Sequence, residues 1–242
     1  MEMLNNSIYP AIFTRKSTRS YSNAPIPEDT LSKLSAFIDE AVPLFPSEQS
    51  AFAIQSHKGS AMKISAYAKN EQTALINLAF MLQQMDLFLQ SNEIGALWTA
   101  SVRATDKQMN GLPYGICLVF GMAGSNLTRT STSEYKRKKA DEISNKPDFI
   151  AIEAIRLAPS TQNLQPWFVS CEDGYIDFYL KRGGVVYDNV LKKLHSLDMG
   201  IAICHAVLAL QNAGYKPTVD IKTDAPDKKG YTYCLSLMNI DL

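Results

Sequence analysis

A short basic segment near the start of the chain could bind a phosphate group. Residues 15–19 read Arg-Lys-Ser-Thr-Arg, which places three cations and two hydroxyl groups within five positions. On an extended backbone these side chains can converge on one anion and supply charge together with several hydrogen-bond donors. A solvated basic turn would have the same composition, so the spacing alone leaves both interpretations open.

A polar loop between two prolines is the second candidate for chemistry. It runs from Pro159 to Pro166, directly before Trp167, and its interior reads Ser-Thr-Gln-Asn-Leu-Gln. Proline fixes φ and ends helices, so both ends of the loop are rigid. Hydroxyl and amide groups on such a loop offer alternating donors and acceptors, which suit the edge of a heteroaromatic ring. An ordinary capped turn that leads into a core tryptophan is the alternative.

The first half of the chain is predicted to position the basic segment with helices and strands. Prolines and acids at residues 25–29 favour a helix start, and Pro43 favours its end. The apolar stripe of the next helix is wide, which predicts burial on more than one side. The expected elements are a helix from residue 25 to 42, a strand over 51–55, a helix over 71–92, strands over 97–103 and 114–120, and a loop over 121–146.

The second half is predicted to repeat this plan around the polar loop. A short helix with Phe149, Ile152 and Ile155 on one face should end at Pro159. A long apolar helix should end at Gly214, and Gly200 inside it predicts close approach of another backbone. The expected elements are strands over 167–171 and 175–180, a helix over 190–213, a segment over 217–221 that could be a strand, and a strand over 231–240.

Similar pieces recur at a roughly constant offset, which indicates a diverged internal duplication. Residues 51–54 match 167–170, and residues 114–118 echo 231–235. The predicted fold is therefore α+β, with mixed or antiparallel sheets around long central helices and two halves that together form a pseudo-dimer. The expected halves are residues 1–146, with the basic segment, and 147–242, with the polar loop. Chance similarity in the order of helices and strands is the alternative.

Composition and charge narrow the class of function. Apolar residues make up 46% of the 242 positions and charged residues 20%, which is typical of a globular chain and not of a disordered one. Lys plus Arg and Asp plus Glu number 24 each, so the zero net charge argues against nucleic-acid binding through excess basic charge. Four scattered cysteines without a Cys-x-x-Cys pair indicate buried thiols in a reducing cytoplasm. No signal peptide, membrane span, metal-binding spacing or catalytic triad is expected.

The two candidate segments together resemble the nitroreductase family of flavoproteins. Chains of that family open with an R-R-S-x-R-type motif, and they carry an A-P-S-x-x-N-x-Q-P-W motif where a helix meets a strand. Residues 15–19 resemble the first motif, and residues 158–167 resemble the second nearly letter for letter. In typical members, each flavin site takes the basic motif from one subunit and the polar loop from the other. Here each half keeps one motif, which resembles the duplicated, pseudo-dimeric type.

The resemblance implies an FMN site with no catalytic side chain and no metal. Arg15 and Ser17 would meet the phosphate, with Lys16 nearby, and Arg19 would lie toward the ribityl chain and the pyrimidine edge. Arg137 and Lys138 resemble a late, phosphate-directed pair of the family, although a solvated charge run is an equal alternative. The residues implied to line the isoalloxazine are Pro159, Ser160, Thr161 and Asn163, with Gln165 near them. Trp98 and Thr99 stand in the reverse of the family's order and receive no role.

The expected activity is that of an FMN-dependent oxidoreductase. It would take hydride from NAD(P)H and reduce nitroaromatic or quinone-type acceptors by ping-pong exchange, as a cytoplasmic monomer with one site per chain. Another flavin redox reaction, such as dehydrogenation or dehalogenation, is one alternative. A flavin-binding protein without turnover is the other.

Overall fold

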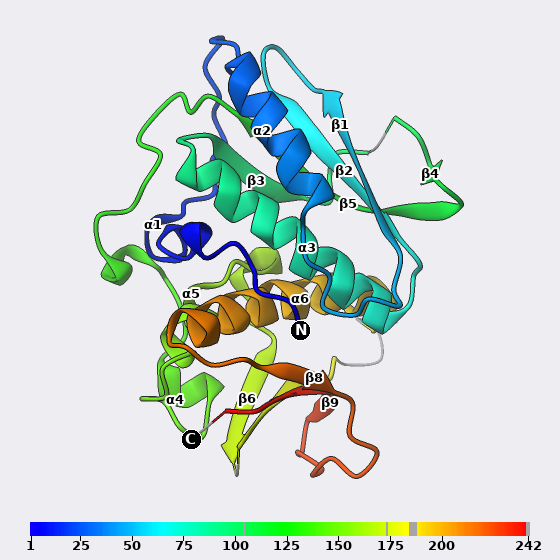
Figure 1. Cartoon of the computed structure of the whole chain (residues 1–242), viewed down its shortest axis with the longest axis vertical. Helices are drawn as coiled ribbons and strands as arrows, with labels where there is room; N and C mark the ends of the chain where they lie inside the picture. Colours follow the sequence, from blue (N-terminus) through cyan, green and yellow to red (C-terminus); the bar gives the residue numbers. More distant parts are fainter. Residues whose placement is uncertain (104, 173, 184–187, 241–242) are drawn as a thin grey trace.

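Two antiparallel sheets lie on either side of a pair of long helices (Figure 1). The computed structural model describes residues 1–103, 105–172, 174–183 and 188–240. From the top of Figure 1 downward come the first sheet, α3 (Gln72–Ser91), α6 (Asp188–Asn212) and the second sheet. The predicted α+β class, with antiparallel sheets around long central helices, is confirmed.

The first sheet has the strand order β1-β2-β5-β3. Its strands are β1 (Ser50–Ser56), β2 (Met62–Ala68), β3 (Gly95–Thr99) and β5 (Leu112–Gly121), and the short β4 (Gln108–Met109) pairs with β5. The sequence prediction missed β2. The strand expected over 97–103 ends early because Ser101 folds back, its backbone N–H donating to Oγ1 of Thr99 over 3.2 Å.

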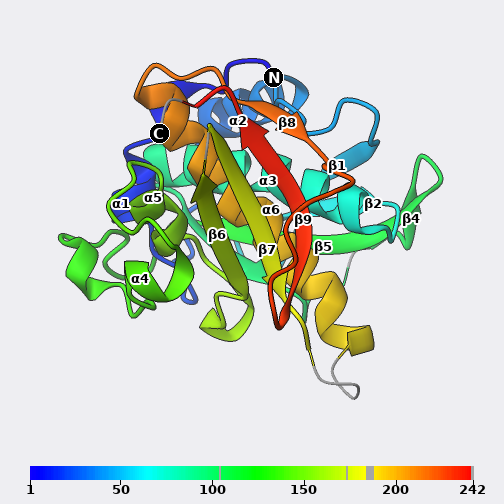
Figure 2. The same ribbon diagram turned by 90° about the horizontal axis from the view of Figure 1, so that it is seen from below.

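The second sheet has the equivalent strand order β6-β7-β9-β8 (Figure 2). Its strands are β6 (Trp167–Glu172), β7 (Tyr175–Lys181), β8 (Thr218–Asp220) and β9 (Tyr231–Met238). In both sheets a hairpin is followed by a long helix, then an edge strand, then a strand that returns to the middle of the sheet. The same path is thus taken twice along the chain.

A bulge marks the same place in each sheet. Strand β5 has one extra residue, Gly115, in its pairing with β2, and β9 has one extra residue, Cys234, in its pairing with β7. Beside each bulge two tyrosine rings meet edge to face, with centroids 5.9 Å apart for Tyr67 and Tyr114 and 5.8 Å apart for Tyr179 and Tyr233. The bulges therefore align residue 114 with 233, whereas the sequence comparison aligned it with 231.

Helices α3 and α6 pack directly against each other and form the centre of the core. A Cβ atom added at Gly200 of α6 would lie 2.2 Å from the carbonyl oxygen of Ile76 in α3. The predicted close approach at Gly200 is therefore confirmed. The stretch Leu191–Asn212 is long and apolar enough to cross a membrane, but 89% of its apolar window is buried inside the protein, as in a core helix.

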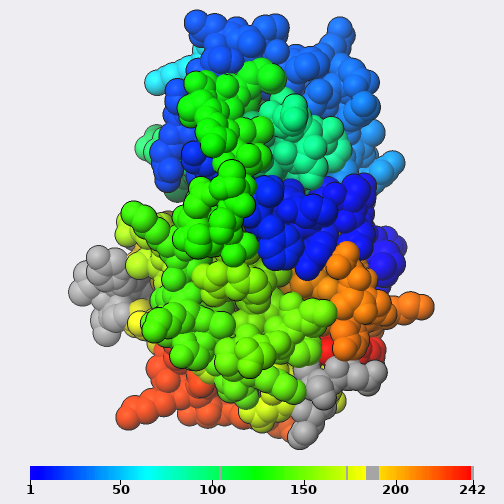
Figure 3. All heavy atoms as spheres, turned by 90° about the vertical axis from the view of Figure 1, so that its left-hand side faces the viewer, coloured from blue at the N-terminus to red at the C-terminus, as the bar shows by residue number. Residues whose placement is uncertain are grey.

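Short helices and connectors join the two halves on one side of the molecule. The N-terminal residues cross to the second half, where the backbone N–H of Leu4 donates to Oε1 of Gln211 over 2.9 Å. The connector between β5 and α5 passes from the first sheet to the second beside the N-terminal residues (Figure 3). The remaining elements are η1 (Asn6–Ile8), α1 (Ala11–Thr14), α2 (Glu28–Asp39), η2 (Thr132–Glu134), α4 (Ala140–Ile143), α5 (Ile152–Leu157) and η3 (Thr161–Asn163). The expected loop over 121–146 thus contains two short helices.

Candidate functional site

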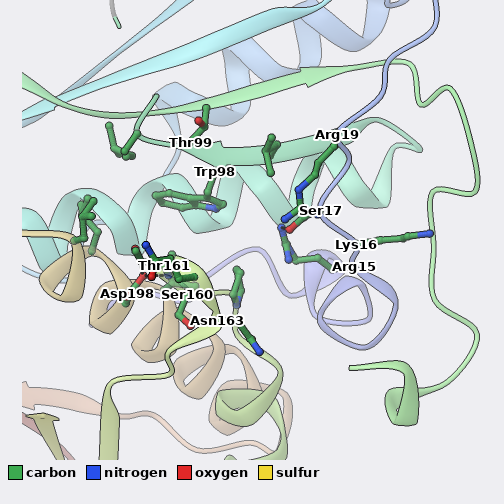
Figure 4. A pocket seen from close by; sticks show the side chains of 18 of the residues that line it. Arg15, Lys16, Ser17, Arg19, Trp98, Thr99, Ser160, Thr161, Asn163 and Asp198 are labelled. Carbon is green, nitrogen blue, oxygen red and sulfur yellow. Dashed lines mark hydrogen bonds between the residues drawn. The ribbon is translucent and has the colours of Figure 1, made fainter. Parts of the chain in front are cut away.

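A cavity of about 690 Å³ lies where the two halves meet (Figure 4). Its walls come from the N-terminal segment, β3, β5, the connector, the loop after α5, and α6. Nine of the eleven residues predicted from the sequence line it: Arg15, Lys16, Ser17, Arg19, Arg137, Pro159, Ser160, Thr161 and Asn163. The basic segment and the polar loop, far apart in the sequence, thus face one space.

The basic segment is held in an extended path along the free edge of β3. The backbone N–H of Thr18 donates to the carbonyl of Ala96 over 2.9 Å, and Ser17 and Ala96 form a parallel bridge. Gly95 permits this approach, because a Cβ there would lie 2.5 Å from Oγ1 of Thr18. Side chains alternate along such a path. In Figure 4, Arg15 and Ser17 face the cavity, whereas Lys16 points away and its Nζ donates to the carbonyl of Asn126 over 3.2 Å.

Arg15 is buried and already has a carboxylate partner. Its Nε lies 2.5 Å from Oδ2 of Asp86 in α3, and both side chains are only 2% exposed. Its Nη2 donates to Oγ of Ser17 over 3.3 Å. Asp86 also accepts a hydrogen bond from Nε1 of Trp98 over 3.3 Å. Because this pair neutralises much of the Arg15 charge locally, an anion in the cavity needs further cations.

The connector supplies two such cations around one tyrosine ring. The guanidinium carbon of Arg129 lies 4.1 Å from the ring centroid of Tyr135, and that of Arg137 lies 5.5 Å from it. Burial, with Arg15 and Arg129 close by, lowers the pKa of Arg137 to about 10. Nε of Arg137 is buried without a hydrogen-bond partner among the described residues. A cluster of like charges with an unused donor is a favourable place for an anion.

The sequence prediction missed Arg129. Its guanidinium donates to the carbonyl oxygen of Arg15, and its backbone N–H donates to the carbonyl of Thr14 over 2.8 Å. The connector is therefore fastened to the start of the basic segment. Arg129 stands alone in a Ser- and Thr-rich stretch, so neither its spacing nor its composition marks it.

The polar loop after α5 has an unusual backbone. Gln162, Asn163 and Gln165 all have positive φ, at 50°, 60° and 46°. Such conformations cost free energy in residues other than glycine and are found at binding sites that hold them in place. Here the loop is braced from inside, since the backbone N–H of Gln165 donates to Oγ of Ser160 over 2.9 Å.

Contacts with the connector fix the outer side of the loop. Nδ2 of Asn163 donates to the carbonyl of Lys136 over 2.6 Å, and its Oδ1 accepts from Nη1 of Arg137. The two remaining predicted residues, Lys138 and Gln165, do not line the cavity. They bind each other instead: Nζ of Lys138 donates to the Gln165 carbonyl and its backbone N–H donates to Oε1 of Gln165, both over 2.8 Å. This pair supports the loop from behind.

The other end of the cavity is apolar. The residues there are Leu97, Trp98 and Ile116 from the first half and Leu194, Leu197 and Ile201 from α6. The spacing on α6 places its three residues, with Asp198, on one helical face. Trp98 extends across the cavity (Figure 4), and its Nε1 also donates to Oε1 of Gln83 over 3.1 Å.

Asp198 is a carboxyl group in this apolar end, and the sequence prediction gave it no role. Its Oδ1 accepts hydrogen bonds from the backbone N–H and Oγ1 of Thr161, over 2.8 and 3.1 Å. Its Oδ2 is buried and has no hydrogen-bond partner among the described residues. Burial raises the pKa of Asp198 to about 7, although the bonds from Thr161 favour the charged form.

A buried polar chain behind the cavity links the two central helices. Nε2 of Gln83 lies 3.1 Å from Nε2 of His205, and Nδ1 of His205 lies 2.8 Å from the carbonyl oxygen of Ala154. Because that carbonyl can only accept, Nδ1 carries the proton and Nε2 accepts from Gln83. Burial lowers the pKa of His205 to about 3, so the ring is neutral. His205 is thus a core residue whose two ring nitrogens both have hydrogen-bond partners.

The two ends of the cavity together define the kind of ligand that fits. One end offers guanidinium groups and a hydroxyl, and the other offers an indole and aliphatic side chains. A molecule with an anionic group at one end and a flat aromatic ring at the other matches this arrangement, and the volume suits such a ligand. Among the described residues, no group of three or more His, Cys, Asp or Glu side chains is placed to hold a metal ion.

Comparison with protein families agrees with this arrangement. The family model described as "Putative TM nitroreductase" matches residues 7–210, most of the chain, including both motifs and all of the cavity lining. The chain belongs to this nitroreductase family. A search of curated protein sequences finds no match.

Solved structures share the fold. A "putative nitroreductase" from Thermotoga maritima MSB8 superposes with a TM-score of 0.70 at 22% identity, covering 99% of this chain and 96% of that one. A nitroreductase with bound FMN from Desulfitobacterium hafniense DCB-2 gives a TM-score of 0.44 at 13% identity, covering 56% of this chain and 100% of that one. A nitroreductase family protein from Clostridium difficile 630 gives 0.44 at 14% identity, covering 59% and 96%. The first of these likenesses shows the nitroreductase fold over the full length of the chain.

Proposed function

We propose that this protein is an FMN-dependent oxidoreductase that takes hydride from NAD(P)H and passes it to a nitroaromatic or quinone-type acceptor. The observation that carries the proposal is that one cavity has both a cationic end and an apolar aromatic end. FMN has a phosphate at one end and an isoalloxazine ring at the other, so its two parts match the two ends. When bound, FMN supplies hydride chemistry without a protein nucleophile.

The cationic end would hold the phosphate. The residues that line this end and could donate to a phosphate are Arg15, Ser17, Arg129 and Arg137. Charge-assisted bonds of this kind are among the stronger contacts a protein can offer. Arg19 would lie toward the ribityl chain and the pyrimidine edge, where a cation favours negative charge on a reduced flavin.

The polar loop and the apolar end would hold the ring. Pro159, Ser160, Thr161 and Asn163 would line it from the second half, facing Trp98 from the first. Lys138 and Gln165, which brace the loop from outside the cavity, would position these residues without touching the ligand.

We further propose that the chain is a duplicated unit and that one chain makes a whole site. The shared strand order of the two sheets and the matching bulges support the duplication. The cavity takes its cations from the N-terminal segment and connector and its polar loop from the second half, so no second chain is required. Free cysteines throughout the chain suit a reducing cytoplasm.

The test is the absorbance spectrum of the protein after FMN is added and the excess removed. We expect about one bound FMN per chain, and we expect NADH or NADPH to bleach its colour under nitrogen. Adding a quinone or a nitroaromatic should then restore the colour. A protein that binds no FMN would contradict the proposal.

Two other outcomes would point to the alternative functions. Bound FMN that neither nucleotide can bleach would indicate a flavin-binding protein without this turnover. Bleaching that is reversed by neither a quinone nor a nitroaromatic would indicate a different flavin redox reaction. Riboflavin, which lacks the phosphate, is the matched ligand control and should bind more weakly than FMN.

A further inference from the structure

We infer that Asp198 is the proton donor that completes the reduction of a quinone-type acceptor in the cavity. This inference rests on the proposed function, because the reduced flavin supplies the hydride. It concerns a residue that neither sequence motif includes.

The position of the carboxyl group supports the role. Asp198 lines the cavity at its apolar end, beside Thr161 and below the indole of Trp98, on the side away from Lys16 and Arg19 (Figure 4). Asp198 as a whole residue is 2% exposed, so water does not solvate it freely. An acid in such a place keeps its proton until a ligand group next to it becomes a better base.

The two oxygens of the carboxyl group have different surroundings. Oδ1 is occupied by both hydrogen bonds from Thr161. Oδ2 is buried without a partner among the described residues, although a buried polar atom ordinarily has one. A proton on Oδ2 would have no acceptor among the described residues, while Thr161 holds the other oxygen in place.

The rest of the cavity wall offers no comparable acid. Its other ionisable residues are the four arginines and Lys16, and it contains no histidine, glutamate, cysteine or tyrosine among the described residues. Arginine holds its proton far above neutral pH, and the Lys16 side chain points away from the cavity. Asp198 is therefore the lining residue suited to give up a proton near neutral pH, where its pKa lies.

Charged and titratable groups surround Asp198 on several elements. The cavity wall holds Arg15 and Arg19 of the N-terminal segment and Arg129 and Arg137 of the connector. The helices that pack against α6 carry Asp86 in α3 and Glu153 and Arg156 in α5, and α6 itself carries Lys193, His195 and His205. Among the described residues none of them forms a hydrogen bond or ion pair with Asp198. Burial is therefore the main influence on the pKa of Asp198 and raises it, whereas the hydrogen bonds from Thr161 lower it.

The proposed step balances as follows. A quinone accepts hydride, two electrons and one proton, from the reduced flavin and becomes the hydroquinone anion. The O–H bond of Asp198 then breaks, its proton passes to the anionic oxygen, and neutral hydroquinone and an Asp198 carboxylate result. Solvent returns a proton to Asp198 after the product leaves.

The main variant is Asp198→Asn, which keeps an oxygen to accept from Thr161 but cannot release a proton. The bound flavin is reduced with NAD(P)H or, independently, by light, and its reoxidation by benzoquinone is followed from pH 5.5 to 8.5. For the original protein we expect the reoxidation rate to fall as pH rises through about 7. For Asp198→Asn we expect at least a tenfold lower rate at pH 6, no such pH dependence, and reduction by NAD(P)H within twofold.

Two controls separate this role from a structural one. Asp39→Asn, at the exposed end of α2, should leave both half-reactions unchanged. Thr161→Val removes one hydrogen bond that favours the charged carboxylate, so the midpoint of the pH profile should move upward. In FMN-free protein, the infrared band of a protonated carboxyl at pH 6 should be present in the original chain and absent in Asp198→Asn.

Several results would overturn the inference. Reoxidation of Asp198→Asn at the original rate, or with the original pH profile, would exclude the role, as would an unmoved midpoint in Thr161→Val or an absent infrared band. Failure of NAD(P)H to reduce the flavin would count against the proposed function alone, because light-driven reduction still permits the reoxidation measurement.

Discussion

Replacing Arg129 should show whether the phosphate of FMN and its ring are bound by different parts of the cavity. Arg129 lies over Tyr135 at the cationic end and makes no ion pair among the described residues. Charge-assisted contacts contribute about 1.5 to 3 kcal/mol each. We therefore expect Arg129→Ala to weaken FMN binding at least tenfold, measured by quenching of flavin fluorescence, and to change riboflavin binding by less than threefold.

The matched control for Arg129 is Arg182→Ala. Arg182 is an exposed arginine directly after β7 whose Nη2 lies 3.5 Å from Oδ1 of Asp227, and it does not line the cavity. This variant should leave both affinities unchanged. Equal losses of FMN and riboflavin affinity in Arg129→Ala would show that the arginine supports the fold of the site instead of binding the phosphate.

Asp198 should also leave a signature in the stability of the FMN-free protein. Its pKa is raised from 3.8 to about 7, so the folded state keeps a proton that the unfolded chain releases above about pH 4. Stability should therefore fall as pH rises from 4 to 7, by about 4 kcal/mol from this group alone. Asp198→Asn lacks this loss, so its stability relative to the original chain should increase across that window and level off above pH 7.

The original chain must be compared with Asp198→Asn because His205 changes the stability with pH in the opposite direction. Its pKa is lowered to about 3, so the unfolded chain binds a proton below pH 6.5 that the folded state does not, and stability rises with pH there. Urea denaturation of both proteins at several pH values cancels this contribution. A stability difference that stays constant from pH 4 to 8 would contradict the raised pKa of Asp198.

The residues predicted from the sequence were those that stand in recognisable motifs. The basic segment and the polar loop could be found because several polar residues occur together between prolines or before a helix. Arg129 and Asp198 could not, since Arg129 is a single cation in a Ser- and Thr-rich stretch and Asp198 is a single carboxyl group in an apolar helix. They enter the cavity because the connector and the apolar face of α6 are folded against it.

At the scale of elements, the contact between α3 and α6 sets the distance between the two halves. Alanine is favoured over glycine by about 1 kcal/mol inside a helix. At Gly200 a Cβ would instead lie 2.2 Å from the Ile76 carbonyl and 2.9 Å from Cβ of Ala79. We expect Gly200→Ala to lower the free energy of unfolding by about 1 to 3 kcal/mol in urea denaturation.

The control for Gly200 is Ser35→Ala on the exposed face of α2. This change should be neutral or slightly stabilising, because alanine is the better helix former. Since the cavity lies between the halves, Gly200→Ala should also weaken FMN binding, whereas Ser35→Ala should not. A Gly200→Ala protein as stable as the original would show that the helices can separate without cost.

Most elements followed from apolar periodicity, and the exceptions have local causes. The long helices were predictable because α3 and α6 carry wide apolar stripes and end near Gly95 and Gly214. The strand β2 was missed although Ile64, Ala66 and Ala68 alternate with polar or aromatic residues. The early end of β3 depends on a side-chain turn at Thr99, which strand propensity does not report.

At the scale of the whole molecule, the site belongs to both halves. The N-terminal residues lie against α6, and the connector passes from the first sheet to the second, so these two segments tie the halves together (Figure 3). The sequence predicted a repeat, and the two sheets have equivalent strand orders. The exact correspondence was not predicted: the matching bulges align residue 114 with 233, two positions from the counterpart that the sequence comparison indicates.

The central claim is that one chain holds one complete flavin site. Sedimentation velocity of the FMN-loaded protein, followed at a wavelength that flavin absorbs, tests it most directly. We predict that at low concentration the flavin sediments with a species of 26.8 kDa that carries about one FMN. Flavin found only in a two-chain species, and released when that species dissociates, would contradict the claim.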